Sequence, residues 1–311
     1  MANLHQAFID FNEKIKLTEA KKNDIRQRRD VVRDKIRSFF KDTLKYNQPK
    51  FQSQGSFTIN TALNPINGNE VDIDDGIYLQ HVSQDENEWP SPREVHKFIV
   101  KALDDHTKDG CESKTSCVRL TYANDFHIDF PIYIMKNGHA RLANTKTNTW
   151  IKSDSKDFKD WFYNNRKNEQ TNRIIRYLKA WRDFTKTDFT SIELTILVVN
   201  NFYGDDRDDA ALYQTLKKCV TFLNTNRGIK KPVSPYEDLW ENYSESKKNT
   251  LIQKFSDLMN DIATAINNQS DNRASIIMRE QFGDRFPKLN DKTTTPITIK
   301  EFSIGAKPWQ L

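Results

Sequence analysis

The spacing of hydrophobic positions near the N-terminus predicts a single long helix. From about residue 10 to residue 46, apolar side chains recur near one stripe, and charged side chains occupy most of the other positions. The stripe consists of Phe11, Ile15, Ile25, Val32, Ile36, Phe39 and Leu44. Because Pro49 cannot continue a helix, the pattern predicts a long spine helix that ends near residue 47.

The pattern then changes to turns, strands and one shorter helix. Gly55 with Ser56 and Asn67 with Gly68 are typical of turns. β-Branched and aromatic residues alternate with polar ones over residues 71–79 and 118–134, which predicts strands. Residues 91–103 begin with a serine cap followed by proline and predict a helix.

Helical spacing dominates the chain after about residue 150. The segments that show it are 158–163, 171–184, 192–202, 210–224 and 249–267. The sequence therefore predicts an α+β fold, with a mixed lobe at residues 1–149, a helical lobe at residues 150–311 and a cleft between them.

The composition is that of a folded protein that lacks glycine-rich phosphate loops. Of the 311 residues, 36% are hydrophobic and 29% are charged, and 19 Phe, 10 Tyr and 6 Trp supply area for a sizeable core. The 9 glycines include no G-x-G pair and no G-x-x-x-x-G-K motif. The phosphate-binding loops of Rossmann and P-loop proteins are therefore excluded.

Charge and cysteine content indicate which kinds of ligand and which cellular compartment the sequence favours. A net charge of +5 suits a polyanionic ligand but does not by itself indicate nucleic acid binding. The basic run at residues 21–41 is interleaved with aspartates, which favours a solvated helix face. The 3 cysteines form no C-x-x-C pair, and we expect them to be reduced. Without an apolar signal segment or a long apolar stretch, we expect a cytoplasmic protein with no membrane partner.

The segment 71–76, with the sequence Val-Asp-Ile-Asp-Asp-Gly, carries the most informative chemistry. On a strand, residues two apart share a face, so Asp72 and Asp74 project together while Val71 and Ile73 point to the core. Two carboxylates held this close raise each other's pKa, and Mg²⁺ or Mn²⁺ would relieve the repulsion. An acidic strand end that leads into a turn is the simpler alternative.

Asp129 supplies a third carboxylate from a distant part of the chain. In the run 127–133, apolar residues at 128, 130 and 132 share one face, so Asp129 lies on the opposite face with His127. A lone acid inside a core is costly, and a functional face explains it better than an exposed strand face does. If this strand lies beside Asp72, three carboxylates can hold two metal ions about 3.5–4 Å apart, as phosphoryl transfer requires.

Gly55 and Ser56 fit a phosphate-binding turn. Glycine lets the backbone approach a ligand closely, and N–H groups together with a serine hydroxyl bind phosphate oxygens. A Gly-Ser turn alone is common. Followed by Asp-x-Asp and by a distant strand with an acid between apolar residues, it resembles the pattern of polymerase-β-like nucleotidyltransferases.

Within that superfamily the sequence is similar to the CD-NTases, the cGAS/DncV-like nucleotidyltransferases of bacterial antiphage systems, and closest to their DncV-like branch. The resemblance extends over most of the chain. It rests on residues 50–57, 70–78, 127–131, 150–154, 160–162, 178–183 and 191–192. It implies a polymerase-β-like lobe with a mixed sheet and a long N-terminal spine helix, followed by a helical lobe.

The resemblance also implies roles for individual residues. Asp72, Asp74 and Asp129 would be the catalytic residues and the ligands of two Mg²⁺ or Mn²⁺ ions. The residues that would bind nucleotides are Gln54, Gly55, Ser56, Lys179, Ser191, Ser234 and Asp238. The last two belong to the loop at 231–238, which resembles the base-contacting segment of the family only loosely.

The function that the resemblance implies is a cyclic oligonucleotide synthase. We expect a cyclic dinucleotide synthase that joins ATP and/or GTP, releases pyrophosphate and signals to a downstream effector in antiphage defence. We expect a monomer with no nucleic acid partner. The alternatives are a template-independent transferase that acts on RNA 3′ ends or on a protein, and a nucleotide-sensing pseudo-enzyme.

Overall fold

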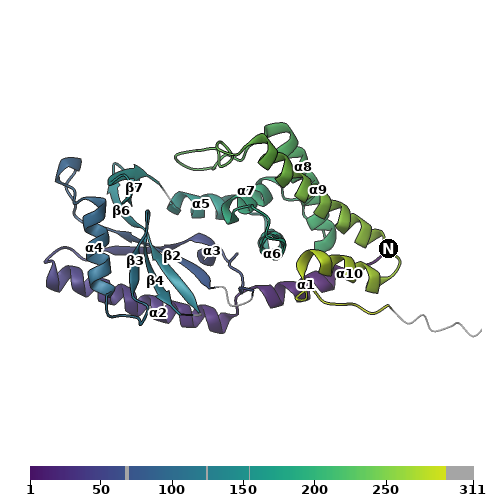
Figure 1. The fold of residues 1–311 in the computed structure, drawn as a ribbon, viewed down its shortest axis with the longest axis horizontal. Helices are drawn as coiled ribbons and strands as arrows, with labels where there is room; N and C mark the ends of the chain where they lie inside the picture. The colour runs from purple at the N-terminus through teal and green to yellow at the C-terminus, as the bar shows by residue number, and fades with distance from the viewer. Residues whose placement is uncertain (67–69, 124, 154, 292–311) are drawn as a thin grey trace, which may run out of the picture.

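The computed structural model describes residues 1–66, 70–123, 125–153 and 155–291 (Figure 1). A sheet with helices packed on it occupies one end of the molecule, and a group of helices occupies the other (Figure 1). This is the expected α+β architecture. The predicted turn at Asn67 and Gly68 lies outside the described residues.

Within the described residues the sheet is mixed and has eight strands in the order β3-β4-β5-β2-β6-β7-β8, with β1 paired to β2. The strands are β1 (Lys50–Gln54), β2 (Val71–Tyr78), β3 (Cys111–Ser113), β4 (Val118–Tyr122), β5 (Phe126–Phe130), β6 (Ile132–Lys136), β7 (His139–Asn144) and β8 (Thr149–Lys152). The predicted strand at 71–79 is β2. The predicted strand at 118–134 is divided into β4, β5 and the start of β6.

Strand β2 is the centre of the sheet. It pairs in parallel with β5, where Asp74 lies opposite Asp129, and then with β6, where Ile77 lies opposite Ile132. Because the register is the same in both, β5 and β6 follow one another along one edge of β2, separated by Pro131, which has no N–H to donate. Strand β1 runs antiparallel along the other edge.

The prediction of one N-terminal helix is wrong. The segment forms α1 (His5–Ile15) and α2 (Glu19–Ser38), and α2 continues into a π-helical turn, η1 (Phe39–Thr43). Thr18 is extended and accepts a hydrogen bond from the backbone N of Lys21, so a new helix starts there. The break lets the two helices bury their stripes in different cores.

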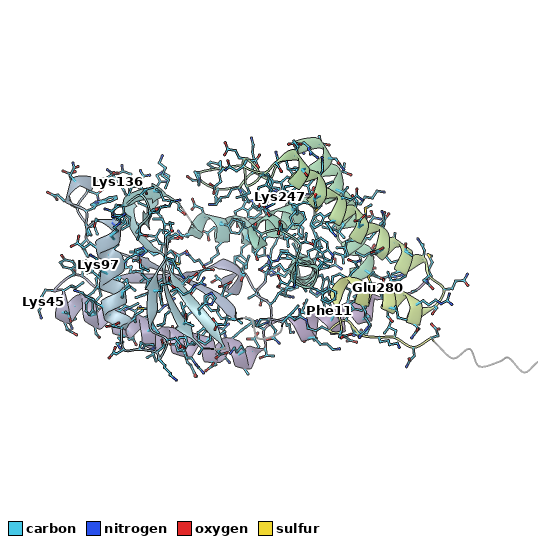
Figure 2. The ribbon with its side chains drawn as sticks, in the orientation of Figure 1. Phe11, Lys45, Lys97, Lys136, Lys247 and Glu280 are labelled. Atoms are coloured by element: carbon cyan, nitrogen blue, oxygen red, sulfur yellow. The ribbon has the colours of Figure 1, made fainter. Side chains whose placement is uncertain are left out.

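The helices α1 and α2 belong to different lobes. Phe11 of α1 lies among the helices at one end of the molecule (Figure 2), with its ring centroid 5.2 Å from that of Phe282. Ile25 and Val32 of α2 pack instead against the sheet, together with Ile99 of α4 (Pro92–Leu103). Helices α2 and α4 thus cover the sheet face that carries the apolar residues of β2.

Local signals were good guides to the remaining helices. Ser91 caps α4 by accepting a hydrogen bond from the backbone N of Glu94, as its sequence predicts. The other helices are α3 (Gly55–Thr58), the short 3₁₀ turn η2 (Glu86–Glu88), α5 (Ser155–Asn165), α6 (Glu169–Thr185), α7 (Ser191–Asn201), α8 (Asp208–Asn226), α9 (Glu245–Asn267) and α10 (Asp271–Phe282). The sequence pattern did not predict β1, β3, β7, β8, α3 or α10.

The sheet extends past the predicted domain boundary. Residues 149 and 150, between which the boundary was placed, lie inside β8, and β8 pairs with β7 from Arg141 to Asn144. The sheet lobe therefore continues to Lys152, and α1 packs with the helical lobe although it lies at the N-terminus. In the described part of the chain, no helix is both long and apolar enough to cross a membrane.

A buried ion pair joins α2 to β2 directly behind the acidic face. Asp75 is 0% exposed and accepts hydrogen bonds from Arg33 at 2.7 Å (Nε) and 2.5 Å (Nη2), and from the Ser53 hydroxyl at 3.0 Å. Register places Ser53 opposite Asp75 on β1. The guanidinium of Arg33 therefore holds α2, β1 and β2 together.

Removal of this guanidinium should destabilise the protein strongly. Arg33→Ala leaves a buried carboxylate without its counter-ion, so we expect the free energy of unfolding to fall by about 3–5 kcal/mol. Arg37→Ala is a matched control, since Arg37 lies over the same Phe51 ring as Arg33 but pairs with the exposed Asp34. It should cost less than about 1 kcal/mol. Urea unfolding measures both, and equal losses would contradict the assignment.

Candidate active site

A cleft of about 440 Å³ lies between the sheet and the helical lobe. Most of the predicted site residues line it: Gln54, Gly55, Ser56, Asp72, Asp74, Asp129, Lys179 and Ser191. They come from β1, α3, β2 and β5 on one side and from α6 and α7 on the other. The fold thus gathers into one cleft residues that are far apart in the sequence.

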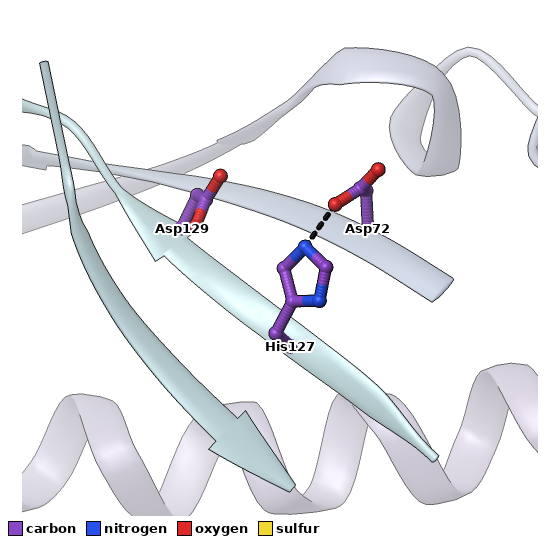
Figure 3. Close-up of side chains that lie close together, drawn as sticks. All are labelled: Asp72, His127 and Asp129. Carbon is purple, nitrogen blue, oxygen red and sulfur yellow. Dashed lines mark ion pairs between the residues drawn. The ribbon is translucent and has the colours of Figure 1, made fainter. Parts of the chain in front are cut away.

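The pairing of β2 with β5 brings the acids together. Asp72 lies opposite His127 and Asp74 opposite Asp129, so these four residues occupy neighbouring positions on two parallel strands. Figure 3 shows Asp72, His127 and Asp129 on the same side of the sheet, with the ring of His127 turned toward Asp72. One ligand atom from each of these three lies within 4.8 Å of those of the other two.

Asp74 lies against the turn that starts α3. The backbone of Gly55 has a φ of +69°, and a Cβ at this position would clash with Oδ2 of Asp74. Only glycine therefore fits both the backbone and the space. Burial, together with the charges of Asp129 and Asp72, raises the pKa of Asp74 to about 6.

Asp72 behaves differently from Asp74. The sequence predicts that the two carboxylates raise each other's pKa, but the contact with His127, helped by the charge of Arg119, lowers the pKa of Asp72. The prediction is therefore wrong for Asp72. Its side chain is also 68% exposed, so it remains partly hydrated. Two acids two residues apart thus have opposite pKa shifts.

Arg119 is a site residue that the sequence analysis missed. It lies opposite Asp129 in the antiparallel pairing of β4 with β5. Its Nε and Nη2 each donate a hydrogen bond of 2.7 Å to one oxygen of Asp129, and Nη2 lies 3.7 Å from Asp72. The alternation in β4 indicates its face, but only the strand register identifies its partner.

The residues that follow the Gly-Ser turn are fixed to α6. Asn172 donates a 2.8 Å hydrogen bond to the carbonyl of Ile59, and Arg176 donates a 2.6 Å hydrogen bond to that of Asn60. One helical turn further, Nζ of Lys179 donates to the carbonyl of Thr61 at 3.0 Å. This stripe of α6 therefore sets the distance between the two walls of the cleft.

Lys179 is a buried cation facing the cleft. It lines the cleft although it is only 3% exposed. Burial, reinforced by the neighbouring Arg182 guanidinium, lowers the pKa of Lys179 to about 7. Arg182 also donates a 2.8 Å hydrogen bond to the hydroxyl of Ser191, at the start of α7. The helical wall thus presents an ammonium and a serine hydroxyl to the cleft.

The structure does not bring Ser234 and Asp238 to the lining of this cleft. Asp238 accepts 2.9 Å hydrogen bonds from the backbone N of Ile229 and of Trp240, and so closes the base of its loop. Lys231 of the same loop does line the cleft. The residue of this loop that reaches the cleft is therefore not one of the two that the resemblance implies.

The donor set suits a divalent metal ion. Asp72, Asp74 and Asp129 offer carboxylate oxygens, the ligands that Mg²⁺ and Mn²⁺ prefer. Arg119 and His127 neutralise part of their charge, yet burial and then the charges of Asp129 and Asp72 still raise the pKa of Asp74, so some repulsion between carboxylates remains. Bound cations would remove this repulsion.

Two sequence-family profiles match the chain. Residues 49–133 match the family described as cyclic GMP-AMP synthase DncV-like, nucleotidyltransferase domain. Residues 168–295 match the family described as cyclic GMP-AMP synthase, C-terminal domain. The first match contains the Gly-Ser turn and all three aspartates, and the second contains Lys179 and Ser191.

Two curated relatives cover most of the chain. A cyclic GMP-AMP synthase of Escherichia coli is 27% identical over 300 residues, which are 76% of this chain and 68% of the relative. A c-di-GMP synthase of Roseivirga ehrenbergii is 24% identical over 273 residues, which are 74% of this chain and 71% of the relative.

The fold is similar to that of solved structures of the Vibrio cholerae DncV cyclic AMP-GMP synthase. One has a TM-score of 0.78 at 22% identity and covers 92% of this chain and 98% of the other. Another, with a TM-score of 0.77 and the same coverage, is a complex with the linear intermediate 5′ pppA(3′,5′)pG. The similarity spans both lobes and therefore supports the two-lobed polymerase-β-like architecture.

The raised pKa of Asp74 predicts a gain in stability when its charge is removed. In metal-free buffer the folded protein releases this proton near pH 6, whereas the unfolded chain releases it near the ordinary value of 3.8. Ionisation of Asp74 therefore destabilises the fold above pH 6, and the penalty fades as the pH falls toward 4. We expect Asp74→Asn to raise the free energy of unfolding by about 1–3 kcal/mol near neutral pH.

Urea unfolding in EDTA, at about pH 7.5 and about pH 4.5, measures this difference. The gain should shrink at the lower pH, where Asp74 stays protonated in the folded protein and the pH is closer to the pKa of 3.8 in the unfolded chain. Asp72→Asn is the matched control, because the lowered pKa of Asp72 predicts no gain on its removal. A gain for Asp74→Asn that is the same at both pH values would argue against the assigned shift.

Proposed function

Because the chain belongs to the DncV-like nucleotidyltransferase family, we propose that it is a cyclic dinucleotide synthase that joins two purine nucleoside triphosphates. The observation that carries the proposal is the convergence of Asp72, Asp74 and Asp129 beside the Gly-Ser turn, in a cleft that Lys179 faces from the other lobe. Clustered carboxylates bind divalent cations and a buried ammonium binds phosphate, so together they suit a triphosphate that carries divalent cations.

The relatives support the choice of substrates. Two are named cyclic GMP-AMP synthases and one c-di-GMP synthase, and a guanine nucleotide is part of all three products. Solved Vibrio cholerae structures contain nonhydrolyzable GTP or a linear pppA(3′,5′)pG intermediate. We therefore propose GTP as one substrate and ATP or a second GTP as the other.

The residues of the cleft have distinct roles in this proposal. Backbone N–H groups of Gly55 and Ser56, together with the Ser56 hydroxyl, hold the donor triphosphate, with Gln54 beside them. Lys179 and Ser191 contact the phosphates from the helical lobe. Ser234 and Asp238 have no role in the proposed site, because neither lines the cleft.

Asp72, Asp74 and Asp129 would hold two Mg²⁺ or Mn²⁺ ions. When bound, such ions neutralise phosphate charge and favour ionisation of the attacking hydroxyl. The protein itself supplies position: the strand register fixes the carboxylates, and the stripe on α6 fixes the turn that faces them.

The reaction consists of two nucleotidyl transfers. In each, a ribose hydroxyl of one nucleotide forms a bond to the α-phosphorus of the other, the bond to pyrophosphate breaks, and the hydroxyl proton is lost to solvent. The first transfer gives a linear dinucleotide that keeps one triphosphate, and the second closes the ring. We propose that the product is a second messenger that acts on a downstream effector in cytoplasmic antiphage defence.

Incubation with nucleotides tests the proposed activity directly. With Mg²⁺ or Mn²⁺ and all four NTPs, we expect a phosphatase-resistant cyclic dinucleotide that contains guanine, with two pyrophosphates released per ring. Mass spectrometry identifies the product, and the double variant Asp72→Asn/Asp74→Asn should make none although it remains folded. Label that extends added RNA or protein would favour the alternative transferases, and nucleotide binding without turnover would favour the pseudo-enzyme.

Lys179→Met should separate stability from substrate binding. Methionine replaces a buried ammonium with an apolar chain of similar length, so the removed desolvation cost offsets the lost hydrogen bond to Thr61, and we expect thermal stability to change little. We expect KM for the nucleotides to rise about tenfold or more, because a charged hydrogen bond to phosphate is lost. Lys217→Met, on the exposed face of α8, is the matched control. Similar KM values for the two variants would remove Lys179 from the site.

A further inference from the structure

His127 lies inside the acidic cluster. It is on β5 between two buried apolar residues, Phe126 and Ile128, but its own side chain lies on the cleft side with Asp72 and Asp129 (Figure 3). The residue is only 8% exposed. Its Nε2 is buried and makes no hydrogen bond of good geometry among the described residues; it makes a close ion-pair contact with the Asp72 carboxylate.

The other ring nitrogen of His127 is held by a second carboxylate. Nδ1 lies 3.1 Å from Oε2 of Glu70, the residue before β2. Because a carboxylate accepts hydrogen bonds, this contact holds a proton on Nδ1, so Nε2 is the nitrogen that would give up its proton and bind a metal ion in place of its contact with Asp72. A carboxylate behind a histidine that faces a charged cluster is the arrangement that orients metal-binding histidines.

The neighbouring oxygens are compatible with a shared ion. One atom each from Asp72, His127 and Asp129 falls within 4.8 Å of the others, close enough for a single cation to contact all three. Arg119 occupies one direction at each oxygen of Asp129, and each oxygen keeps a further lone pair. A simple ion pair between His127 and Asp72 would need neither Glu70 nor the third ligand.

We propose that His127 is a metal ligand and that Asp72, His127 and Asp129 form a mixed nitrogen–oxygen centre that favours Mn²⁺ over Mg²⁺. The inference rests on the proposed function and adds to it a ligand and a metal preference. Mg²⁺ strongly prefers oxygen donors, whereas imidazole nitrogen suits transition-metal ions. A nitrogen donor therefore shifts the relative affinity of this position toward Mn²⁺.

Electron spin-echo spectroscopy of bound Mn²⁺ tests the ligand without any turnover. The full-length protein is loaded with substoichiometric Mn²⁺ in the absence of nucleotide, and nitrogen modulation from a directly bound imidazole is sought. We expect this modulation in the wild-type protein, and its frequency should change when histidine is labelled with ¹⁵N. Wild-type protein that binds Mn²⁺ without nitrogen modulation would overturn the proposal.

Two variants separate the ligand from the residue that positions it. His127→Gln removes the nitrogen donor but keeps a polar group beside Asp72, and we expect modulation to disappear and Mn²⁺ affinity to fall about tenfold or more, with Mg²⁺ affinity nearly unchanged. Glu70→Ala should weaken Mn²⁺ binding but keep the modulation. Equal losses of Mn²⁺ and Mg²⁺ affinity in His127→Gln would contradict the preference.

The outcomes distinguish this inference from the proposed function. Thermal unfolding of each metal-free variant shows whether the fold is kept, and calorimetric titration with Mn²⁺ or Mg²⁺ alone gives the affinities. Nitrogen modulation in a protein that makes no cyclic dinucleotide would refute the proposed function but support the proposed metal centre. A cyclic product made by a protein without nitrogen modulation would refute the proposed metal centre but support the proposed function.

Discussion

Repulsion among carboxylates that the strand register forces together is the constraint on which this cleft depends. Parallel pairing puts Asp74 beside Asp129 and Asp72 beside His127, and no rotation of a side chain can take these residues far apart. Part of the charge is balanced by Arg119 from β4 and by His127 from β5. Asp74 lies against the Gly-Ser turn, and burial, together with the remaining charges of Asp129 and Asp72, raises its pKa to about 6.

The two walls of the cleft are held relative to one another by buried polar contacts. The short segment 59–61 receives hydrogen bonds from three residues of α6, while Arg33 and Asp75 anchor the adjoining strands to α2. Buried hydrogen bonds are directional, and an unmade one costs free energy. The segment after the Gly-Ser turn therefore cannot slide along α6 without losing several of them. These contacts hold the wall of the cleft that carries the Gly-Ser turn against α6 of the helical lobe.

Periodicity and caps predicted much of the fold, because these signals are local. The strand carrying Asp72 and the helix capped by Ser91 could be located in this way. The break before Thr18 could not be located from local signals, because the apolar residues on both sides of it keep helical spacing. The break is needed only because α1 packs in the core of the helical lobe and α2 packs against the sheet. Likewise, the three aspartates were found from motif spacing, whereas Arg119 depends on the register of β4 against β5. Asp238 has the residue type of a ligand but is used by its own loop.

The buried charges of the core and those of the cleft differ in a way that points to the ligand. In the core, Asp208 is bound by Arg173, Gln170 and Tyr177, and the pKa of Asp208 is lowered. In the cleft, Asp74 and Lys179 have no ion-pair partner among the described residues, and burial shifts each pKa toward the neutral form. Such groups reduce stability, so their retention is best explained by function. The proposed triphosphate and its divalent metal ions would place a cation next to Asp74 and an anion next to Lys179.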